Sequence, residues 1–279
     1  MKTTVFLGII LWPFLVMAQI IHSPFPMKGS DFITIDKEKI TLCTVYKITE
    51  DYDGLADSIP VMAVEYGSLG LPAVLYTFGE NEFDAEILDT TAITYYKYDD
   101  KVRLWIEDTE DKEYGESKTL YTYNKKGQLV KKEVATVDPP TYQYKYDKKG
   151  LLTEIYITQK MPVYDDNGDF NGKTFERPAS RYTVENDSRG RISSMSFYLL
   201  MGNEESDELT GLKRWEYDDK GRVSNLLYYQ SDGTTLEMET PLYYNDLGLL
   251  SGYDEISYGE TVQFRLVYCR DCIQSWMKD

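Results

Sequence analysis

Histidine is almost absent from this sequence, in which His22 is the only one among 279 residues. Serine–histidine and cysteine–histidine nucleophile systems, and the commoner catalytic zinc sites, need a positioned imidazole. Phosphate-loop, dinucleotide-binding and nucleophile-elbow motifs are missing as well. A glycoside hydrolase would need only two carboxylates, but the 47 acidic residues single out no pair. We therefore expect a protein that is not an enzyme and holds no cofactor.

Basic residues are in deficit, with 30 Lys and Arg against 47 Asp and Glu, for a net charge of −17. Nucleic acids and anionic lipid surfaces are recognised by clustered Lys and Arg, so neither is an expected partner. An acidic surface is also a common route to solubility, so the charge alone does not predict a basic partner.

Cysteine is scarce, and the three residues of this type are Cys43, Cys269 and Cys272. An odd number in an oxidising compartment implies one disulfide and one further thiol. The last two form a C-x-x-C motif, but the βαβ setting of a redox-active pair is missing. Zinc-ligand spacing is missing too. We expect a structural disulfide, which joins either Cys43 to one of the pair or the pair to each other.

Long apolar runs are absent except for residues 5–17, which follow Lys2 and precede Ala18. This arrangement is typical of a secretion signal over residues 1–18, and the run is too short to span the ~30 Å of a membrane interior. We expect an exported protein in the periplasm, at the cell surface or outside the cell, without an integral membrane segment after cleavage.

Helical periodicity is nearly absent, whereas the chain holds 25 Tyr, a residue that favours strands. A nine-residue pattern recurs: an aromatic or aliphatic residue, any residue, Tyr, Asp or Asn, two polar residues, Gly, any residue and an aliphatic residue. Its copies are 96–104 (YKYDDKVRL), 121–129 (YTYNKKGQL), 144–152 (YKYDKKGLL), 184–192 (VENDSRGRI), 215–223 (WEYDDKGRV) and 242–250 (LYYNDLGLL). Sequence repeats of this length indicate stacked supersecondary units.

Each copy predicts the turn of a β-hairpin. Tyr121 and Tyr123 lie two residues apart and project from one face of a strand. Asn124 can accept a hydrogen bond from the backbone two residues later, and Gly127 can take the positive φ that closes a type I turn with a bulge. Val102 occupies the glycine position of the first copy.

The remaining segments also look like strands. Residues 19–95 contain the runs FITI, TLCTVYKI and AVLYTF, which we expect to form an N-terminal β capping region. Residues 96–279 form the repeat region, and 253–269 predict a last hairpin. We predict one continuous all-β domain, a curved antiparallel meander of repeated hairpins. Because more than about ten twisted strands cannot stay flat, it should form an open shell or half-barrel with two free edges.

The turn sequences of residues 96–250 resemble the YD repeat of bacterial Rhs-type and teneurin-like proteins. The resemblance is carried by Tyr98-Asp99, Tyr123-Asn124 with Gly127, Tyr146-Asp147 with Gly150, and Tyr217-Asp218 with Gly221. In that family the repeats imply a sheet that spirals into a shell, which larger members use to enclose a toxic C-terminal domain. This chain has too few repeats to enclose such a cargo, so we expect a short secreted form without a toxin domain.

One polar segment offers a weak candidate for a calcium site. Asp165, Asn167 and Asp169 alternate oxygen ligands in the sequence DDNGDFNG. The glycine positions do not fit a calcium-binding loop, and a polar hairpin tip explains the same composition. The sequence therefore favours no metal.

Two binding functions remain open, and both leave the ligand unidentified. The chain could be an interaction scaffold at the cell envelope or surface that binds a protein by a sheet face or by strand addition. Alternatively, it could be a carbohydrate-binding module in which exposed rings stack on a glycan. Cross-strand packing is a third explanation for such rings. The candidate ring residues are Trp105, Trp215, Tyr217, Tyr228 and Tyr229.

Overall fold

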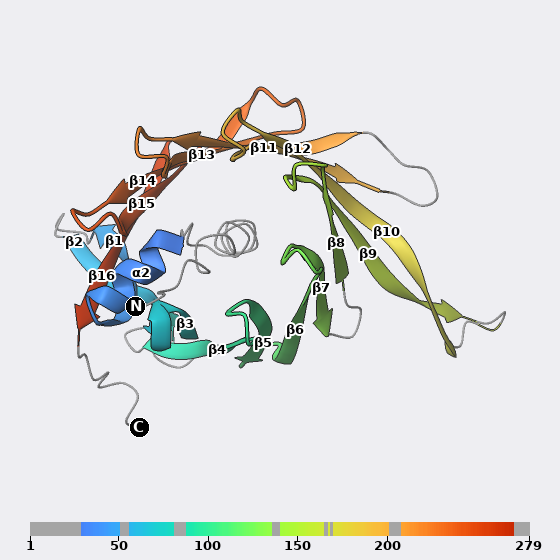
Figure 1. Ribbon diagram of the computed structural model, residues 1–279, viewed down its shortest axis with the longest axis horizontal. Helices are drawn as coiled ribbons and strands as arrows, with labels where there is room; N and C mark the ends of the chain where they lie inside the picture. Colours follow the sequence, from blue (N-terminus) through green and yellow to red (C-terminus); the bar gives the residue numbers. More distant parts are fainter. Residues whose placement is uncertain are drawn as a thin grey trace, which may run out of the picture. The chain divides into compact units, whose positions relative to one another are not determined.

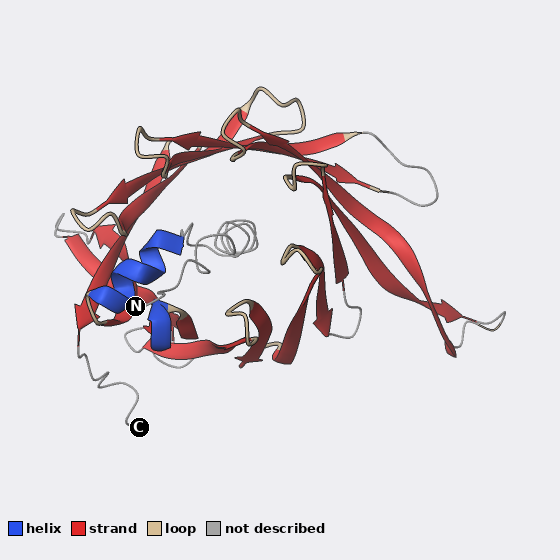
Figure 2. Ribbon diagram, in the orientation of Figure 1, coloured by secondary structure: helices blue, strands red, loops and turns tan. Residues whose placement is uncertain are grey.

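The computed structural model describes residues 29–50, 56–80, 88–135, 140–164, 167, 170–200 and 208–270. Within these residues the chain forms one α-helix, a short 3-10 helix and sixteen β-strands (Figures 1 and 2). Neither of these helices is long and apolar enough to cross a membrane.

The elements follow one another with short connections. The helices are α2 (Gly29–Lys37) and η1 (Ser68–Gly70). The strands are β1 (Ile40–Glu50), β2 (Ala56–Tyr66), β3 (Pro72–Glu80), β4 (Leu88–Tyr98), β5 (Leu104–Asp111), β6 (Gly115–Tyr123), β7 (Leu129–Ala135), β8 (Pro140–Tyr146), β9 (Leu152–Tyr164), β10 (Phe170–Asn186), β11 (Ile192–Leu199), β12 (Leu209–Tyr217), β13 (Val223–Tyr229), β14 (Leu236–Tyr244), β15 (Leu250–Ser257) and β16 (Glu260–Arg270). The predicted all-β meander is confirmed, and the expected hairpin over 253–269 corresponds to β15 and β16.

The strand order closes on itself, which corrects the expected open shell. β1 pairs antiparallel with β2 on one side and with β16 on the other, so that Cys43 lies opposite both Val64 of β2 and Tyr268 of β16. The full order, β1-β16-β15 through to β3-β2, is that of a closed barrel. Two unpaired edges would expose rows of backbone donors and acceptors, and pairing β1 with β16 satisfies them.

Contacts between Cα atoms divide the chain into two compact units. The first comprises the described parts of residues 1–116, 242–255 and 261–279, and the second comprises those of 117–241 and 256–260. The first unit therefore holds α2, β1 to β5 and most of β15 and β16, and the second holds most of β6 to β14.

The predicted turns are confirmed. In each one the Asp or Asn backbone carbonyl accepts a hydrogen bond from the N–H of the residue at the glycine position, at 2.8–3.0 Å. The side-chain Oδ1 also accepts from the N–H four residues later, for example from Gln128 to Asn124 at 3.1 Å. The residues at the glycine position all have positive φ: Val102 (62°), Gly127 (81°), Gly150 (86°), Gly190 (77°), Gly221 (73°) and Gly248 (82°).

In several copies the tyrosine of the repeat joins a hairpin to the one before it. In the second unit, the Tyr146 hydroxyl donates to the carbonyl of Leu129 at 2.8 Å, and the Tyr217 hydroxyl donates to that of Ile192 at 2.7 Å. Asn186 replaces tyrosine in its copy, and its Nδ2 donates to the Leu152 carbonyl at 2.8 Å. In the first unit, Tyr98 and Tyr268 make the same bond to Pro72 and Leu250, both at 2.8 Å. A side chain that satisfies a neighbouring hairpin's carbonyl explains why the motif needs this residue.

Neighbouring turns of the second unit are also in contact. A Cβ on Gly190 would lie 3.2 Å from the side chain of Leu151, and one on Gly221 would lie 3.5 Å from that of Arg191. The Arg191 guanidinium bonds Asp187 of its own turn and lies 4.0 Å from the ring centre of Tyr217 in the next hairpin. Side chains of successive turns thus stack as a row.

A further copy of the turn, which sequence reasoning missed, joins β2 to β3. Gly67 stands in the Asp position and donates its N–H to the Leu71 carbonyl at 2.8 Å. Leu69 and Gly70 both have φ of 67°. The copy is hard to see in the sequence because glycine replaces the Asp and Pro72 replaces the aliphatic residue.

The run FITI is helical rather than a strand, which corrects one expectation for the N-terminal region. Phe32 and Ile35 belong to α2 and are 1% and 0% exposed. The helix lies against the Gly70 turn so closely that a Cβ on Gly70 would lie 2.2 Å from the Phe32 carbonyl oxygen. Tertiary packing therefore overrides the strand preference of two isoleucines and a threonine. The runs TLCTVYKI and AVLYTF are strands as expected, in β1 and β3.

Candidate functional site

The predicted ring residues do not form one exposed platform. Trp105 is 52% exposed on β5 in the first unit, whereas Trp215 is 6% exposed on β12 in the second. Tyr217 bonds the Ile192 carbonyl under the Arg191 guanidinium. Tyr228 and Tyr229 are half-buried neighbours on β13 and project from opposite faces of the sheet. Of the five, the structure brings only Trp215 and Tyr228 to the same side chain, that of Lys213.

The cysteines carry no reactive thiol among the described residues. Cys43 is free and 2% exposed. The expected alternative in which Cys43 forms a disulfide with one cysteine of the C-x-x-C motif is therefore wrong. Cys269 is disulfide-bonded, and Cys272 lies outside the described residues. Burial raises the pKa of Cys43 to about 12, against the opposing effect of hydrogen bonds from Tyr268 and Tyr66. Its thiol is therefore neutral and a poor nucleophile.

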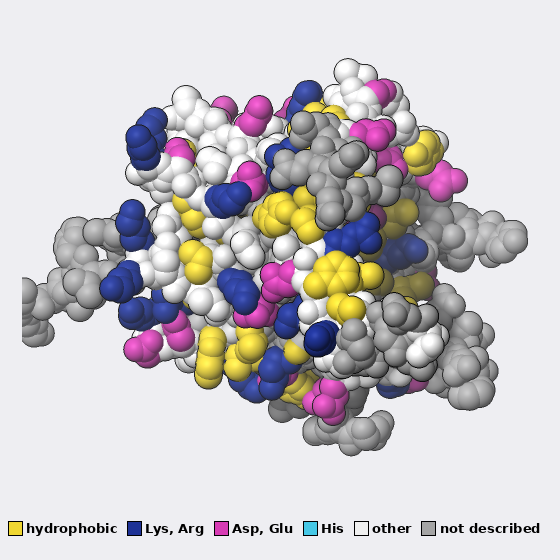
Figure 3. Space-filling view, turned by 90° about the vertical axis from the view of Figure 1, so that its right-hand side faces the viewer, with side chains coloured by type: hydrophobic (Ala, Val, Ile, Leu, Met, Phe, Trp, Pro, Cys, Tyr) yellow, Lys and Arg dark blue, Asp and Glu magenta, His cyan; other side chains and the backbone are white. Residues whose placement is uncertain are grey.

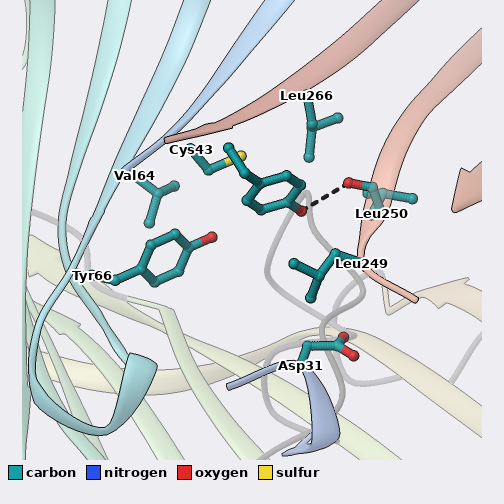
Figure 4. Close-up of a pocket in the computed structure, with 8 residues that line it drawn as sticks. Asp31, Cys43, Val64, Tyr66, Leu249, Leu250 and Leu266 are labelled. Carbon is teal, nitrogen blue, oxygen red and sulfur yellow. Dashed lines mark hydrogen bonds between the residues drawn. The ribbon is translucent and has the colours of Figure 1, made fainter. Parts of the chain in front are cut away.

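Cys43 belongs to a buried polar cluster in the first unit (Figure 4). A cavity of about 10 Å³ is lined by Asp31, Cys43, Tyr66, Tyr268 and aliphatic side chains. Burial raises the pKa of both tyrosines. A volume of this size holds at most about one water molecule. The cluster thus stabilises the join between β1, β2 and β16 and leaves no room for a ligand.

The calcium candidates are only partly described. Asn167 is exposed in a turn between β9 and β10, and Asp165 and Asp169 lie outside the described residues. Among the described residues, no group of three or more His, Cys, Asp or Glu side chains could hold a metal.

A groove of about 340 Å³ lies in the first unit, beside the ends of β4 and β5. Its charged residues are Glu110, Asp111, Lys112 and Glu116. Asp111 already accepts the N–H groups of Glu113 and Tyr114 at 2.8 and 2.9 Å, and Lys112 bonds Asp89 at 3.2 Å. Asp111 and Lys112 are thus already bonded within the first unit.

One face of the second unit's sheet has an unusual composition for so acidic a chain. Strand registers place the following side chains on it, and we call it the aromatic face: Tyr121, Lys132, Tyr142, Tyr144, Ile155, Ile157, Tyr182, Val184, Met195, Phe197, Lys213, Trp215, Leu226 and Tyr228. Neighbouring carboxylates alternate with these residues and so project from the opposite face: Glu133, Glu154, Glu185 and Glu216. As defined by these described residues, the aromatic face carries two lysines and no Asp or Glu.

Lys213 lies between two aromatic rings of the aromatic face. Its Nζ is 5.0 Å from the ring centre of Trp215, two residues along β12, and 4.6 Å from that of Tyr228, its register partner on β13. On the other side its register partner is Met195 of β11. No carboxylate of the described residues pairs with it. Desolvation lowers the pKa of Lys213 to about 8.

Lys132, on β7, also lies near two aromatic rings. Its Nζ lies 5.7 Å from the ring centre of Tyr121 and 5.4 Å from that of Tyr142. Between the two lysines, Tyr182 and Phe197 stack with ring centres 4.7 Å apart. Rings, aliphatic groups and two ammonium groups thus share one face of the sheet, and much of it is buried: Tyr121 is 4%, Tyr144 is 6% and Trp215 is 6% exposed. Alternation along each strand shows which residues share a face of that strand. It indicates this common face only when the registers between the strands are also known.

The hairpin β9–β10 extends beyond its neighbours, and we call residues 160–164 and 170–178 the ribbon (Figure 1). The β8–β9 register ends at Pro140 opposite Gln159, and the β10–β11 register ends at Ser180 opposite Leu199. Within the ribbon the two strands pair with each other, as in Phe175 opposite Met161. Phe175 is 51% exposed. Figure 3 views the side toward which the ribbon projects in Figure 1, where many Lys and Arg side chains (dark blue) lie near hydrophobic ones (yellow).

Comparisons with known proteins give distant structural similarities. Neither a family model nor a curated protein sequence matches the chain. A porin-like protein from Bacteroides uniformis is 13% identical over 82% of this chain and 96% of its own, with a TM-score of 0.47. A porin-like protein from Bacteroides vulgatus is 10% identical over 84% and 99%, with a TM-score of 0.37. A β-barrel-like DUF1849 protein from Brucella abortus is 10% identical over 82% and 96%, with a TM-score of 0.25. These similarities are too low for any inference about function.

Proposed function

We propose that this chain is an exported, non-catalytic repeat scaffold of the YD type that binds a protein partner at the cell envelope or surface. The observation that supports this proposal is the ribbon, which continues two strands of the sheet beyond their neighbours. Isolated two-stranded ribbons are marginally stable in water, and a third strand from a partner would stabilise this one.

The prolines indicate which backbone groups of the ribbon point outward. Antiparallel residue pairs are alternately hydrogen-bonded to each other or directed away from each other. Pro162 lies opposite Thr174, and Pro178 lies opposite Thr158. A proline has no N–H to donate, so both pairs fit the outward type. By alternation, Glu176 is outward too. The N–H and C=O groups of Thr174 and Glu176 therefore face away from β9.

The two edges of the ribbon differ in what they offer. Each edge has one outward proline, Pro162 on β9 and Pro178 on β10, and each removes a donor. On β10, Thr174 and Glu176, which precede Pro178, keep both their donors and their acceptors, so a partner strand can pair along this stretch. Phe175 and Arg177 project from one face of this strand, opposite Met161 and Gln159. The partner that fits is an extended protein segment with an apolar and an acidic side chain two residues apart, because residues i and i+2 of a strand share a face.

Photocrosslinking in the native cells tests this proposal. A photoreactive phenylalanine analogue at Phe175 should yield one defined protein adduct, and the same analogue at Leu236, which is 45% exposed on β14, should not. Thr174→Pro removes an outward N–H without breaking a bond to β9, so it should abolish the adduct. Thr174→Val keeps the N–H and should retain it. An adduct that persists with both Thr174→Pro and Glu176→Pro would refute strand addition at this edge.

The carbohydrate-binding alternative has less support. Stacking on a sugar requires accessible ring faces, and of the five candidate rings Trp105 alone is exposed. Trp215 is buried against Lys213, and Tyr217 is held under Arg191.

A further inference from the structure

We infer that the stacked repeat turns of the second unit bind a linear acidic polysaccharide through exposed Lys and Arg side chains at their tips. The cations of this surface, which we call the basic row, are Lys125, Lys126, Lys148, Lys149, Arg189 and Lys220. The basic row lies outside the ribbon, so the inference does not depend on the partner strand proposed there.

Four turns carry the basic row, and they lie side by side in chain order: 124–128, 147–151, 187–191 and 218–222. The Gln128 side chain of the first turn donates to the Gly150 carbonyl of the second at 3.3 Å. The third and fourth turns each place their glycine against a side chain of the turn before. Each hairpin contributes two strands, so neighbouring turns are roughly 10 Å apart and the row is about 30 Å long.

The cations of the basic row are available to a ligand. All six are exposed, and none forms an ion pair with another described residue. The four turns also contain four Asp residues, two of which are neutralised locally. Asp187 accepts from the Arg191 guanidinium and Asp218 from that of Arg222, both at 2.7 Å. Six exposed cations therefore remain against two carboxylates, those of Asp147 and Asp219.

The turn structure does not require these cations. The same turn in the first unit has one exposed cation, Lys101, within residues 99–103, and none within 67–71 or 245–249. Type I turns accept most residues at their tips, as Ser188 and Asp219 illustrate in the second unit. The excess of acidic residues in the whole chain already favours solubility. The concentration of Lys and Arg on four adjacent tips therefore points to an anionic partner.

The net charge of −17 does not oppose such a partner. At physiological ionic strength, exposed charges more than ~8 Å apart are largely screened from each other. A ligand that lies along the turn tips therefore interacts mainly with the basic row. The sequence argued against polyanions because it showed no cluster of Lys and Arg. The stacking of turns 23 to 40 residues apart brings such a cluster together.

The tips indicate which kind of polyanion fits. Proteins that bind single-stranded nucleic acids stack the bases on aromatic rings, and the tip positions of the four turns hold no aromatic residue. They hold no apolar residue that could enter a lipid surface either. Five of the six cations are lysines, which act as point charges without a fixed bidentate geometry. Basic clusters of this kind bind acidic glycans such as heparin, and an extended glycan can contact each turn in succession by charge, without ring stacking.

A titration of the purified full chain with fluorescently labelled heparin at physiological salt tests the inference by fluorescence anisotropy. The row variant combines Lys126→Gln, Lys149→Gln, Arg189→Gln and Lys220→Gln. It should bind heparin at least about tenfold more weakly than the wild type, because each lost cation removes a contact that releases counterions. The dependence of the affinity on salt should also become less steep.

The matched control variant combines Lys37→Gln, Lys101→Gln, Lys160→Gln and Arg177→Gln. It removes the same number of Lys and Arg charges from exposed positions outside the basic row, so it should bind heparin as tightly as the wild type. Circular dichroism verifies that both variants keep a β-sheet spectrum. Equal losses of heparin affinity in the two variants would overturn the inference.

Competition experiments on the wild type need no variant. Dextran sulfate should displace labelled heparin, whereas uncharged dextran should not. Oligothymidylate and phosphatidylglycerol vesicles, at equal anionic charge, should compete less well than unlabelled heparin. A wild-type chain that does not bind heparin, or that prefers the oligonucleotide or the vesicles, would contradict an acidic polysaccharide as the ligand.

Discussion

The base of the β9–β10 hairpin and the ribbon at its far end belong to the same two strands but are held in different ways. At the base, Asn186 donates to the Leu152 carbonyl, and Gly190 lies against Leu151 of the preceding turn. The residues there pair on both sides, with β8 and with β11. In the ribbon the two strands pair with each other alone among the described residues.

This difference shows which end of the β9–β10 hairpin contributes to the stability of the sheet. The repeat places a hydrogen-bonding side chain, an Asx turn and a positive-φ residue at every base, so each hairpin supports the next. The ribbon, in contrast, carries prolines and exposed charges, which restrict indiscriminate pairing. A segment that contributes little to the stability of the sheet is free to evolve for binding.

The largest loss of stability is expected at the Gly70 turn, against which α2 packs. Gly70→Ala would place a methyl group 2.2 Å from the Phe32 carbonyl oxygen, at a φ of 67°. The overlap displaces α2, and the conformation itself is strained, so we expect a loss of ~3 kcal/mol in the free energy of unfolding. Denaturant titration measures this loss.

Gly115→Ala is the matched control. Gly115 has a φ of 78°, but nothing lies within 4 Å of its missing Cβ. It should lose only the ~1 kcal/mol of backbone strain. Equal losses for the two variants would show that the contact with α2 contributes nothing.

Much of the repeat region was predictable because its signals are local. Asn124 and Gly127 determine their own turn within four residues, and even Val102, which breaks the pattern, keeps a φ of 62°. The copy at Gly67 was missed because two of its key positions are substituted. The helical state of Phe32 and Ile35 depends on contacts with the Gly70 turn, which no local pattern reveals.

The closure of the sheet and the surroundings of Lys213 could not be predicted for a related reason. The register of β1 with β16, in which Ile40 lies opposite Arg270, joins residues from the two ends of the described chain. The sequence singled out the rings of Trp215 and Tyr228 but not Lys213. The position of Lys213 between these rings depends on the register of β12 with β13. Periodicity assigns alternate faces to residues within one strand but does not tell which faces of different strands coincide.

A smaller effect is expected from removing one tie between hairpins. Tyr217→Phe deletes the hydroxyl that donates to the Ile192 carbonyl at 2.7 Å and leaves the ring under Arg191. The free energy of unfolding should fall by ~1 kcal/mol, the usual value of one such hydrogen bond. Thermal or denaturant unfolding measures it, and Tyr258→Phe, at a ring that is 79% exposed, serves as the control. If both variants matched the wild type, the tyrosine of the repeat would act through its ring alone.

The smallest effect is expected in the ribbon, where Phe175→Ser replaces a side chain that is 51% exposed. Since the ring packs against few neighbours, the free energy of unfolding should change by less than ~0.5 kcal/mol. Ile155→Ala, in the base of the same hairpin, should cost ~3 kcal/mol because Ile155 is 0% exposed. Denaturant unfolding of both variants compares the two ends of one pair of strands directly. A large loss for Phe175→Ser would mean that the ribbon is part of the cooperative core, and it would then be a poor candidate for a segment that awaits a partner strand.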